Sequence, residues 1–393
     1  MNTNMPLVSR SLSFSPVAVL RAPCGYSASS ALKSCCLLLF ALLCFSPVLP
    51  AQQPPKLKVD PSWPLELPNN WIMGQIGGLT VDSHDHIWVL QRPGTDTPDE
   101  LGAAQTPQRS MCCLAAKPVL EFDSSGKLLN AWGGPGAGYD WPKTEHGIHV
   151  DKNGNVWIGG NTPADRMVLK FTNDGRFLMQ IGKPSTDPVD SSRTDILGRP
   201  AGIDVDEAAH EVYIADGYGN HRVIVFDSET GAFKRMWGAY GNKPSDADPG
   251  PYAPPTAANP PAQQFRNPVH CVHIATDGQV YVCDRVNNRI QVFTEAGKYL
   301  QEFPIRLETL FQGSAWDLAF SADRAQQFLF IADGEDNMIW IVQRADGKIL
   351  GSIGHNGRNA GQFHWVHQIA SDSAGNVYTG EVDTGKRIQK FVP

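Results

Sequence analysis

Six copies of one strand–turn–strand pattern predict an all-β fold, a six-bladed β-propeller with four antiparallel strands in each blade. Short apolar runs alternate with Asn-Gly, Asp-Gly and Ser-Gly turns, which is typical of antiparallel hairpins. Most copies continue into a third strand that ends in Phe and a fourth strand after a Gly turn. Repeats of about 40–50 residues with four strands are typical of blades around a central channel. The copies begin with residues 77–93, 146–161, 201–226, 270–293, 316–342 and 367–391.

The last copy has only three strands before Pro393. Residues 56–63 (KLKVDPSW) precede the first copy and have the character of a strand. We expect this N-terminal strand to supply the fourth strand of the last blade and so to close the ring. A β-sandwich is the alternative fold, but it does not explain why the six copies share one register.

The first 51 residues are predicted to be a signal peptide that is not part of the fold. Lys33 precedes a short apolar run, and the small residue Ala51 stands at a plausible cleavage site. The run is shorter than the ~20 residues that span a bilayer, and an uncleaved membrane anchor is the alternative. The propeller is then expected to occupy residues 52–393 and to be secreted or periplasmic.

Charge and hydropathy narrow the class of partner. The chain has a formal net charge of -7, whereas nucleic-acid-binding surfaces usually carry a basic excess, so we expect no nucleic-acid partner. No stretch beyond residue 55 is apolar for 18 residues, so we expect no membrane contact beyond the N-terminal segment. We expect a monomer that takes a small molecule or a peptide.

Four of the eight cysteines lie beyond the signal segment. Cys271 and Cys283 fall on neighbouring strands of one hairpin. They can form a disulfide or stay as two buried free thiols, and the sequence does not decide between these states. Cys112 and Cys113 are adjacent in the sequence. None of the four has the spacing of a zinc ribbon.

Histidine occupies one register position in alternate copies. When the first strands are aligned by their turns, His146, His270 and His367 fall at the same position in the second, fourth and sixth copies. First strands line the channel of a propeller, and alternate blades of six are related by about 120°, so the three imidazoles are expected to converge at one mouth. Three histidines with an open fourth position are typical of a catalytic zinc site. His149 and His273 lie three residues further on, toward the opposite face of the strand, and are not expected to share the metal.

Further polar residues are expected at the same mouth, because the end of each second strand lies beside the start of the first. Arg92, Tyr218 and Arg285 stand at such ends. Arginine can hold a carboxylate with a bidentate fork, and a tyrosine beside a metal and arginines can act as a general base. The long connections are expected to rise on this side: 93–117, 184–200 and 239–266.

Four segments carry a resemblance to a known family. They are HGIHVDKNGNVWI from 146, DGYGNHRVIVF from 216, CDRVNNRIQVF from 283 and VHQIASDSAGNVYTGE from 366. The repeats resemble NHL repeats, and residues 70–393 resemble peptidyl-α-hydroxyglycine α-amidating lyase. The resemblance implies a zinc ion on the three histidines, a tyrosine base and two arginines that bind the substrate carboxylate. Carried over by position, these are His146, His270, His367, Tyr218, Arg92 and Arg285.

The chain departs from this family at two positions. The family binds a structural calcium ion (Ca2+) through two backbone carbonyls, here those of Leu79 and Ile148, and an aspartate after the last zinc histidine. This chain has Gln368 there, an amide in place of the carboxylate. Trp365 stands where the family has a methionine near the substrate, which indicates a different pocket shape.

The predicted function is that of a zinc-dependent lyase. It would cleave the C–N bond of a peptidyl-α-hydroxyglycine or a similar carbinolamide that carries a carboxylate, releasing an amide and glyoxylate. The alternative is a non-catalytic exported NHL-repeat propeller that binds a protein or a glycan at its mouth, since a fold alone does not determine function. A lactonase-type hydrolase would hold its metal with carboxylate and amide oxygens, which these mouth positions do not offer.

Overall fold

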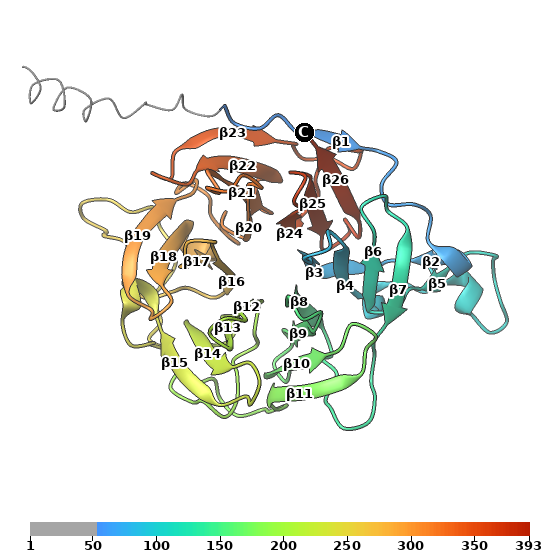
Figure 1. Cartoon of the computed structure of the whole chain (residues 1–393), viewed down its shortest axis with the longest axis horizontal. Coiled ribbons are helices and arrows are strands. Elements are labelled where there is room, and N and C mark those ends of the chain that lie inside the picture. Colours follow the sequence, from blue (N-terminus) through green and yellow to red (C-terminus); the bar gives the residue numbers. More distant parts are fainter. Residues whose placement is uncertain (1–52) are drawn as a thin grey trace, which may run out of the picture. The chain divides into compact units, whose positions relative to one another are not determined.

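The computed structural model describes residues 53–393, and residues 54–393 form a ring of six four-stranded antiparallel sheets (Figure 1). The predicted six-bladed β-propeller is therefore confirmed. The predicted signal peptide lies outside the described residues, so its boundary and the export of the chain stay predictions. Within the described part of the chain, no helix is long and apolar enough to cross a bilayer.

Each blade runs from an inner strand at the central channel to an outer strand at the rim (Figure 1). Blade 1 contains β3 (Gln75–Val81), β4 (Ile87–Arg92), β6 (Val119–Phe122) and β7 (Leu128–Trp132). Blade 2 contains β8 (Glu145–Val150), β9 (Val156–Gly160), β10 (Met167–Phe171) and β11 (Phe177–Gly182). Blade 3 contains β12 (Gly202–Asp206), β13 (Glu211–Asp216), β14 (Arg222–Asp227) and β15 (Phe233–Trp237). Blade 4 contains β16 (Val269–Ile274), β17 (Gln279–Asp284), β18 (Arg289–Thr294) and β19 (Tyr299–Pro304). Blade 5 contains β20 (Asp317–Phe320), β21 (Phe328–Asp333), β22 (Met338–Gln343) and β23 (Ile349–Ile353). Blade 6 contains β24 (Val366–Ser371), β25 (Val377–Glu381), β26 (Ile388–Val392) and β1 (Lys58–Asp60); a short parallel pair, β2 (Trp71–Ile72) and β5 (Leu114–Ala115), lies outside the blades.

The N-terminal strand closes the ring. Strand β1 pairs antiparallel with β26, with Lys58 opposite Val392 and Asp60 opposite Lys390. Val59 packs against the apolar cluster between blades 5 and 6. The predicted closure of the last blade by residues 56–63 is therefore confirmed, and it joins the two ends of the described chain in one sheet.

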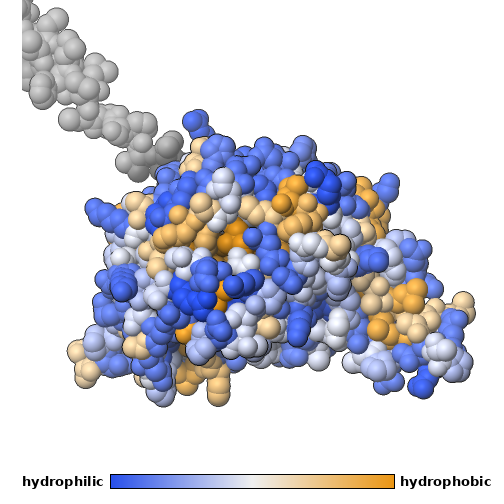
Figure 2. Space-filling view, turned by 90° about the horizontal axis from the view of Figure 1, so that it is seen from below, coloured by the Kyte–Doolittle hydropathy of each residue, from blue (hydrophilic) through white to orange (hydrophobic). Residues whose placement is uncertain are grey.

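The core consists of six apolar clusters, one between each pair of neighbouring blades. The second strand of each blade is buried on both faces, which explains its continuous run of β-branched and aromatic residues. The outer strands are less buried; in β11 only Ile181 is fully buried, and the other residues are partly or fully exposed. The side of the ring in Figure 2 is accordingly mostly hydrophilic, with apolar residues in small patches. Packing between blades therefore holds the inner strands, and the histidines on them, in place.

A β-bulge interrupts the first strand pair of four blades near the register position of the histidines. The pairing shifts between His146 and Ile148, between Val269 and Cys271, between Val366 and Gln368, and between Ile76 and Gly78. Such a bulge adds one residue to a strand and changes the direction of a side chain. In β8 the added residue is Gly147, with φ of +72°; a Cβ there would lie 2.4 Å from the carbonyl oxygen of Ala201.

Two disulfides join the four described cysteines. Cys271 and Cys283 lie opposite each other on β16 and β17 and are bonded, which decides between the two states that the sequence leaves open. Both side chains are buried. Cys112 and Cys113 are bonded to each other in the long connection after β4.

Removing the Cys271–Cys283 disulfide is expected to lower the free energy of unfolding by about 3 kcal/mol, because the bond closes a short loop of the unfolded chain. The measurement is denaturant unfolding of the Cys271→Ala/Cys283→Ala protein. The control is Cys112→Ala/Cys113→Ala, since a bond between adjacent residues closes almost no loop. Equal stability of the two double variants would contradict this account.

Candidate metal centre

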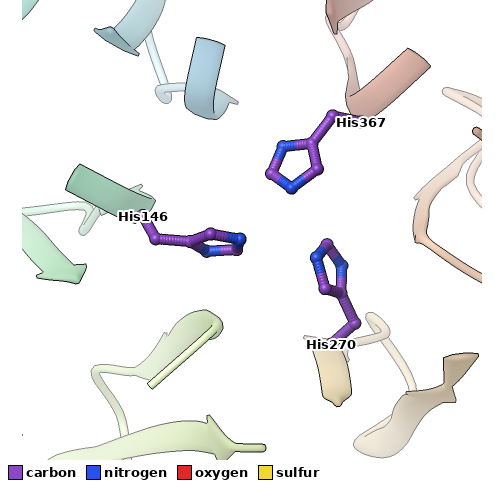
Figure 3. Close-up of side chains that lie close together, drawn as sticks. All are labelled: His146, His270 and His367. Atoms are coloured by element: carbon purple, nitrogen blue, oxygen red, sulfur yellow. The ribbon is translucent and has the colours of Figure 1, made fainter. Parts of the chain in front are cut away.

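The structure brings together the three histidines that the sequence places at one register. His146 of β8, His270 of β16 and His367 of β24 point toward one another across the channel (Figure 3). Their ring centroids lie 4.8–5.1 Å apart, and the ring planes meet at 82–85°. One ring nitrogen from each lies within 4.8 Å of the other two. The arrangement is close to threefold symmetric, as expected for alternate blades of a six-bladed ring.

Backbone carbonyls of the intervening blades orient the three rings. The Nδ1 atom of His146 lies 2.9 Å from the carbonyl oxygen of Ala201, and that of His270 lies 2.5 Å from the carbonyl oxygen of Trp316. The Nδ1 atom of His367 lies 3.1 Å from the carbonyl oxygen of Ile76. A carbonyl only accepts hydrogen bonds, so each Nδ1 carries the proton and donates it. Each Nε2 therefore keeps a free lone pair, which is the form that binds a metal.

These carbonyls explain why histidine is found in alternate blades. Ala201, Trp316 and Ile76 lie at or next to the same register position in blades 3, 5 and 1. Each histidine of one blade is thus oriented by the backbone of the next blade around the ring. Three blades supply the imidazoles, and the other three supply the acceptors that hold them.

The three imidazoles are neutral near pH 7. All three side chains are buried, with 0–2% of the residue exposed. Burial is the largest cause that lowers the pKa of each ring well below its usual value, and the charges of Arg92 and Arg285 lower it further. Neutral imidazole is the ligand form of histidine, so these rings can bind a metal without first losing a proton.

Tyr218 lies directly beside the cluster. Its hydroxyl oxygen is 3.0 Å from Nε2 of His146 and 3.0 Å from Nε2 of His270. The residue follows β13 and is only partly buried, whereas the histidines are enclosed. If a metal were bound by the three histidines, a substrate on that metal would lie next to the phenol oxygen. This oxygen could then accept a proton from the substrate or donate one to it.

Arg92 and Arg285 also lie at this site, and neither is paired with a carboxylate. Arg92 donates to the carbonyl oxygen of Glu145 at 2.8 Å and to Oε1 of Gln75 at 3.0 Å. Arg285 donates to Oε1 of Gln312 at 2.6 Å, and its buried Nε has no hydrogen-bond partner. Burial is the largest cause that lowers the pKa of both guanidiniums. Two buried cations with neutral partners form a site that favours an anion.

Trp316 and Arg199 also lie at this mouth, and the sequence did not mark either of them as a functional residue. Trp316 stacks under the guanidinium of Arg285 at 4.4 Å and packs against Trp365 at 5.4 Å between ring centroids. Arg199, in the predicted mouth connection 184–200, lies 5.6 Å from the centroid of the Tyr218 ring. The contact of Arg199 depends on how a connection folds back over the blades, for which the repeat pattern gives no signal.

His149 and His273, three residues after His146 and His270, face a cavity of the channel that His270 also lines. His149 lies 3.5 Å from Asp204, and Nε2 of His273 lies 2.8 Å from Asp317. The cavity has a volume of about 700 Å³ and is also lined by Leu79, Ile148 and Gln368, the residues of the calcium site that the resemblance implies. Calcium favours carboxylate oxygens, but Gln368 is neutral and Asp317 is held by His273. The cavity is also lined by other carboxylates, Asp204 and Asp372 among them. Calcium binding therefore stays a prediction and has no part in the function proposed below.

Zinc fits the three-histidine cluster better. The donors are three neutral imidazole nitrogens, each oriented by a second hydrogen bond, and no carboxylate of the described residues belongs to the cluster. Three nitrogen donors with space for one more ligand suit zinc, whereas calcium and magnesium favour oxygen. The binding of zinc stays a prediction.

The chain is similar to amidating enzymes and to NHL-repeat proteins. The NHL repeat family matches residues 197–226, in blade 3. Peptidyl-glycine alpha-amidating monooxygenase A of Xenopus laevis is 26% identical over 86% of this chain and 33% of its own length. The probable peptidyl-alpha-hydroxyglycine alpha-amidating lyase of Caenorhabditis elegans is 23% identical over 56% of each chain. NHL repeat-containing protein 3 of Mus musculus is 25% identical over 86% of this chain and 85% of its own length.

The predicted resemblance to NHL repeats and to peptide-amidating enzymes is thus confirmed as a similarity: the NHL model matches one repeat, and the relatives are similar over most of the propeller. The chain spans about a third of the length of the amidating monooxygenases that it matches. The whole activity of those longer proteins therefore does not transfer to it, and any reaction of this propeller is a matter of proposal.

Proposed function

We propose that the protein is a zinc-dependent lyase that cleaves the C–N bond of an N-acyl- or peptidyl-α-hydroxyglycine, giving an amide and glyoxylate. The observation that carries the proposal is the combination of three converging neutral imidazoles with Tyr218 at 3.0 Å from two of them. The unpaired guanidiniums of Arg92 and Arg285 support it, because the substrate has a carboxylate. Relatives named as amidating enzymes support the reaction class.

Each group at the mouth has a role in this reaction. His146, His270 and His367 would hold a zinc ion, which as a Lewis acid would polarise a substrate oxygen. The fork of Arg285, whose Nε has no partner, and that of Arg92 would bind the carboxylate and fix the orientation of the carbinolamide.

The proton would move at the hydroxyl oxygen of Tyr218. This oxygen accepts the proton of the substrate hydroxyl while the phenol gives its own proton to the leaving amide nitrogen, as the C–O bond becomes a carbonyl and the C–N bond breaks. One proton is taken up and one is released, so that tyrosine is restored. The products are a primary amide and glyoxylate, and no external oxidant or reductant is needed.

The test is release of glyoxylate from an N-acyl-α-hydroxyglycine by the purified protein, measured together with its zinc content. We expect glyoxylate and amide in equal amounts, loss of activity after chelation and recovery with added zinc. Full activity in metal-free protein would contradict the proposal.

Replacing Arg285 by alanine is expected to raise KM and to lower kcat/KM by about 10- to 100-fold, because charge-assisted hydrogen bonds to the carboxylate are lost. Zinc content should not change. Arg306→Ala is the control, since this exposed arginine pairs with Glu308. A kcat/KM of Arg285→Ala within about 2-fold of the parent value would show that the guanidinium does not bind the substrate.

A second candidate is a non-catalytic propeller that binds a partner at its mouth. The similarity to NHL repeat-containing protein 3, which covers most of both chains, favours it. The two candidates differ in the expected effect of His270→Ala. The lyase loses zinc and activity, whereas a binding propeller keeps its affinity for the partner.

A further inference from the structure

Arg199 is a third guanidinium beside Tyr218. Its Nε donates to the carbonyl oxygen of Asn161 at 2.8 Å, and its Nη1 approaches the carbonyl oxygen of Tyr218 at 3.4 Å. The amide of Tyr218 in turn donates to the carbonyl oxygen of Arg199 at 3.2 Å. The position of Arg199 is thus coupled to that of the tyrosine through the backbone.

Among residues 53–393, no carboxylate lies close enough to Arg199 to form an ion pair. The carboxylate of Asp165 acts on its charge from a greater distance and accepts hydrogen bonds from backbone amides instead. The guanidinium forms no ion pair with a carboxylate, and its Nη2 has no acceptor among these residues. Another arginine of the same connection, Arg193, is paired with Asp187 and Asp195 at 2.7 and 2.6 Å. The connection therefore carries acidic partners for one arginine and leaves the other, at the mouth, unpaired.

The backbone at Arg199 is unusual for this residue type. Its φ is +67°, in the left-handed region that glycine adopts without strain. Arg306 and twelve other described non-glycine residues share this region, so the angle records local strain at Arg199 and does not by itself assign a role to the side chain.

Arg199 lies on the solvent side of the other two cations. Arg92 and Arg285 are 8% and 5% exposed, whereas Arg199 and Tyr218 are only partly buried. The guanidiniums of Arg285 and Arg199 lie 5.9 and 5.6 Å from the centroid of the Tyr218 ring. In the proposed reaction, one substrate carboxylate would occupy the two more buried arginines. The more exposed Arg199 would then be available to the acyl part of the substrate.

The charge of this mouth contrasts with that of the whole chain. The protein has a net charge of -7, yet three guanidiniums without carboxylate partners surround Tyr218. Positive charge in a partly enclosed site concentrates anionic ligands.

We propose that Arg199 determines specificity by binding a second anionic group on the acyl side of the substrate, so that the preferred substrates are dianionic. This inference rests on the proposed lyase function and adds the substrate class. A carboxylate or phosphate within a few atoms of the carbinolamide has the chemistry that a free guanidinium recognises. Arg199 takes no part in the proton transfer.

The experiment compares two substrates of equal size, N-succinyl-α-hydroxyglycine and its terminal amide, N-succinamyl-α-hydroxyglycine. We expect the parent protein to prefer the acid by about 10-fold or more in kcat/KM, as for a charge-assisted hydrogen bond. Arg199→Gln should remove this preference by lowering kcat/KM for the acid substrate alone, and Arg199→Lys should restore part of the preference. Arg193→Gln, in the same connection, should keep the full preference. No preference in the parent protein, or an equal loss on both substrates in Arg199→Gln, would overturn the inference.

A binding measurement separates this inference from the lyase proposal. Calorimetric titration with N-succinylglycine and N-succinamylglycine, which lack the hydroxyl group and do not react, reports anion recognition without turnover. Tighter binding of the acid that depends on Arg199 supports the inference even if no glyoxylate is released. Equal binding of the two compounds contradicts it, whatever the activity.

Discussion

The His367→Ala protein is expected to lose its zinc and to release glyoxylate at least 100-fold more slowly than the parent protein. Changes to residues that merely orient a metal ligand cost about 10- to 100-fold, so loss of a ligand should cost more. His367 is the most informative of the three, because Tyr218 contacts His146 and His270 and keeps both contacts in this variant. The measurements are zinc content per chain and initial rate.

The control for this variant is His149→Ala. His149 lies in the cavity of the channel and pairs with Asp204 at 3.5 Å, outside the three-histidine cluster. We expect it to retain one zinc per chain and parent activity. Stoichiometric zinc and full activity in His367→Ala would show that the cluster is not the metal site. Circular dichroism checks that both variants fold, since His367→Ala leaves the carbonyl of Ile76 without its partner.

The Tyr218→Phe protein is expected to keep its zinc and its KM while kcat falls by about 100- to 10,000-fold, the usual contribution of a general acid–base group. The change removes one oxygen and leaves the ring between Arg199 and Arg285. A fall in kcat without a change in KM identifies a group that acts in the transition state.

The variants of Tyr218 and His367 are expected to differ in one respect. Tyr218→Phe should bind zinc as the parent protein does, whereas His367→Ala should not. A kcat of Tyr218→Phe within about 3-fold of the parent value would remove the tyrosine from the mechanism. Loss of zinc in Tyr218→Phe would instead show that the phenol oxygen is itself a ligand.

The ring and the three histidines could be predicted because they follow from repetition. Hairpins with Asn-Gly and Asp-Gly turns keep a constant register, so His146, His270 and His367 fall at equivalent points of equivalent strands. The closure of blade 6 by residues 56–63 follows from counting strands. Arg92, Tyr218 and Arg285 were found at the mouth because antiparallel strands bring their positions to one edge.

The parts that could not be predicted depend on contacts between elements. The carbonyls of Ala201, Trp316 and Ile76 orient the imidazoles, but every residue has a carbonyl, and the sequence does not mark these three. Arg199 lies in a connection without periodicity, and its approach to Tyr218 follows from a left-handed backbone at one residue. The state of Cys271 and Cys283 was open because neighbouring strands suit both a disulfide and two packed thiols.

The measurement that tests the central claim most directly is X-ray absorption at the zinc edge, made on the purified protein together with metal analysis. We expect one zinc per chain, with three imidazole nitrogens at about 2.0 Å and a fourth light atom from water or substrate. A protein that holds no zinc after purification in its presence, or zinc bound mainly by sulfur or carboxylate oxygen, would contradict the account.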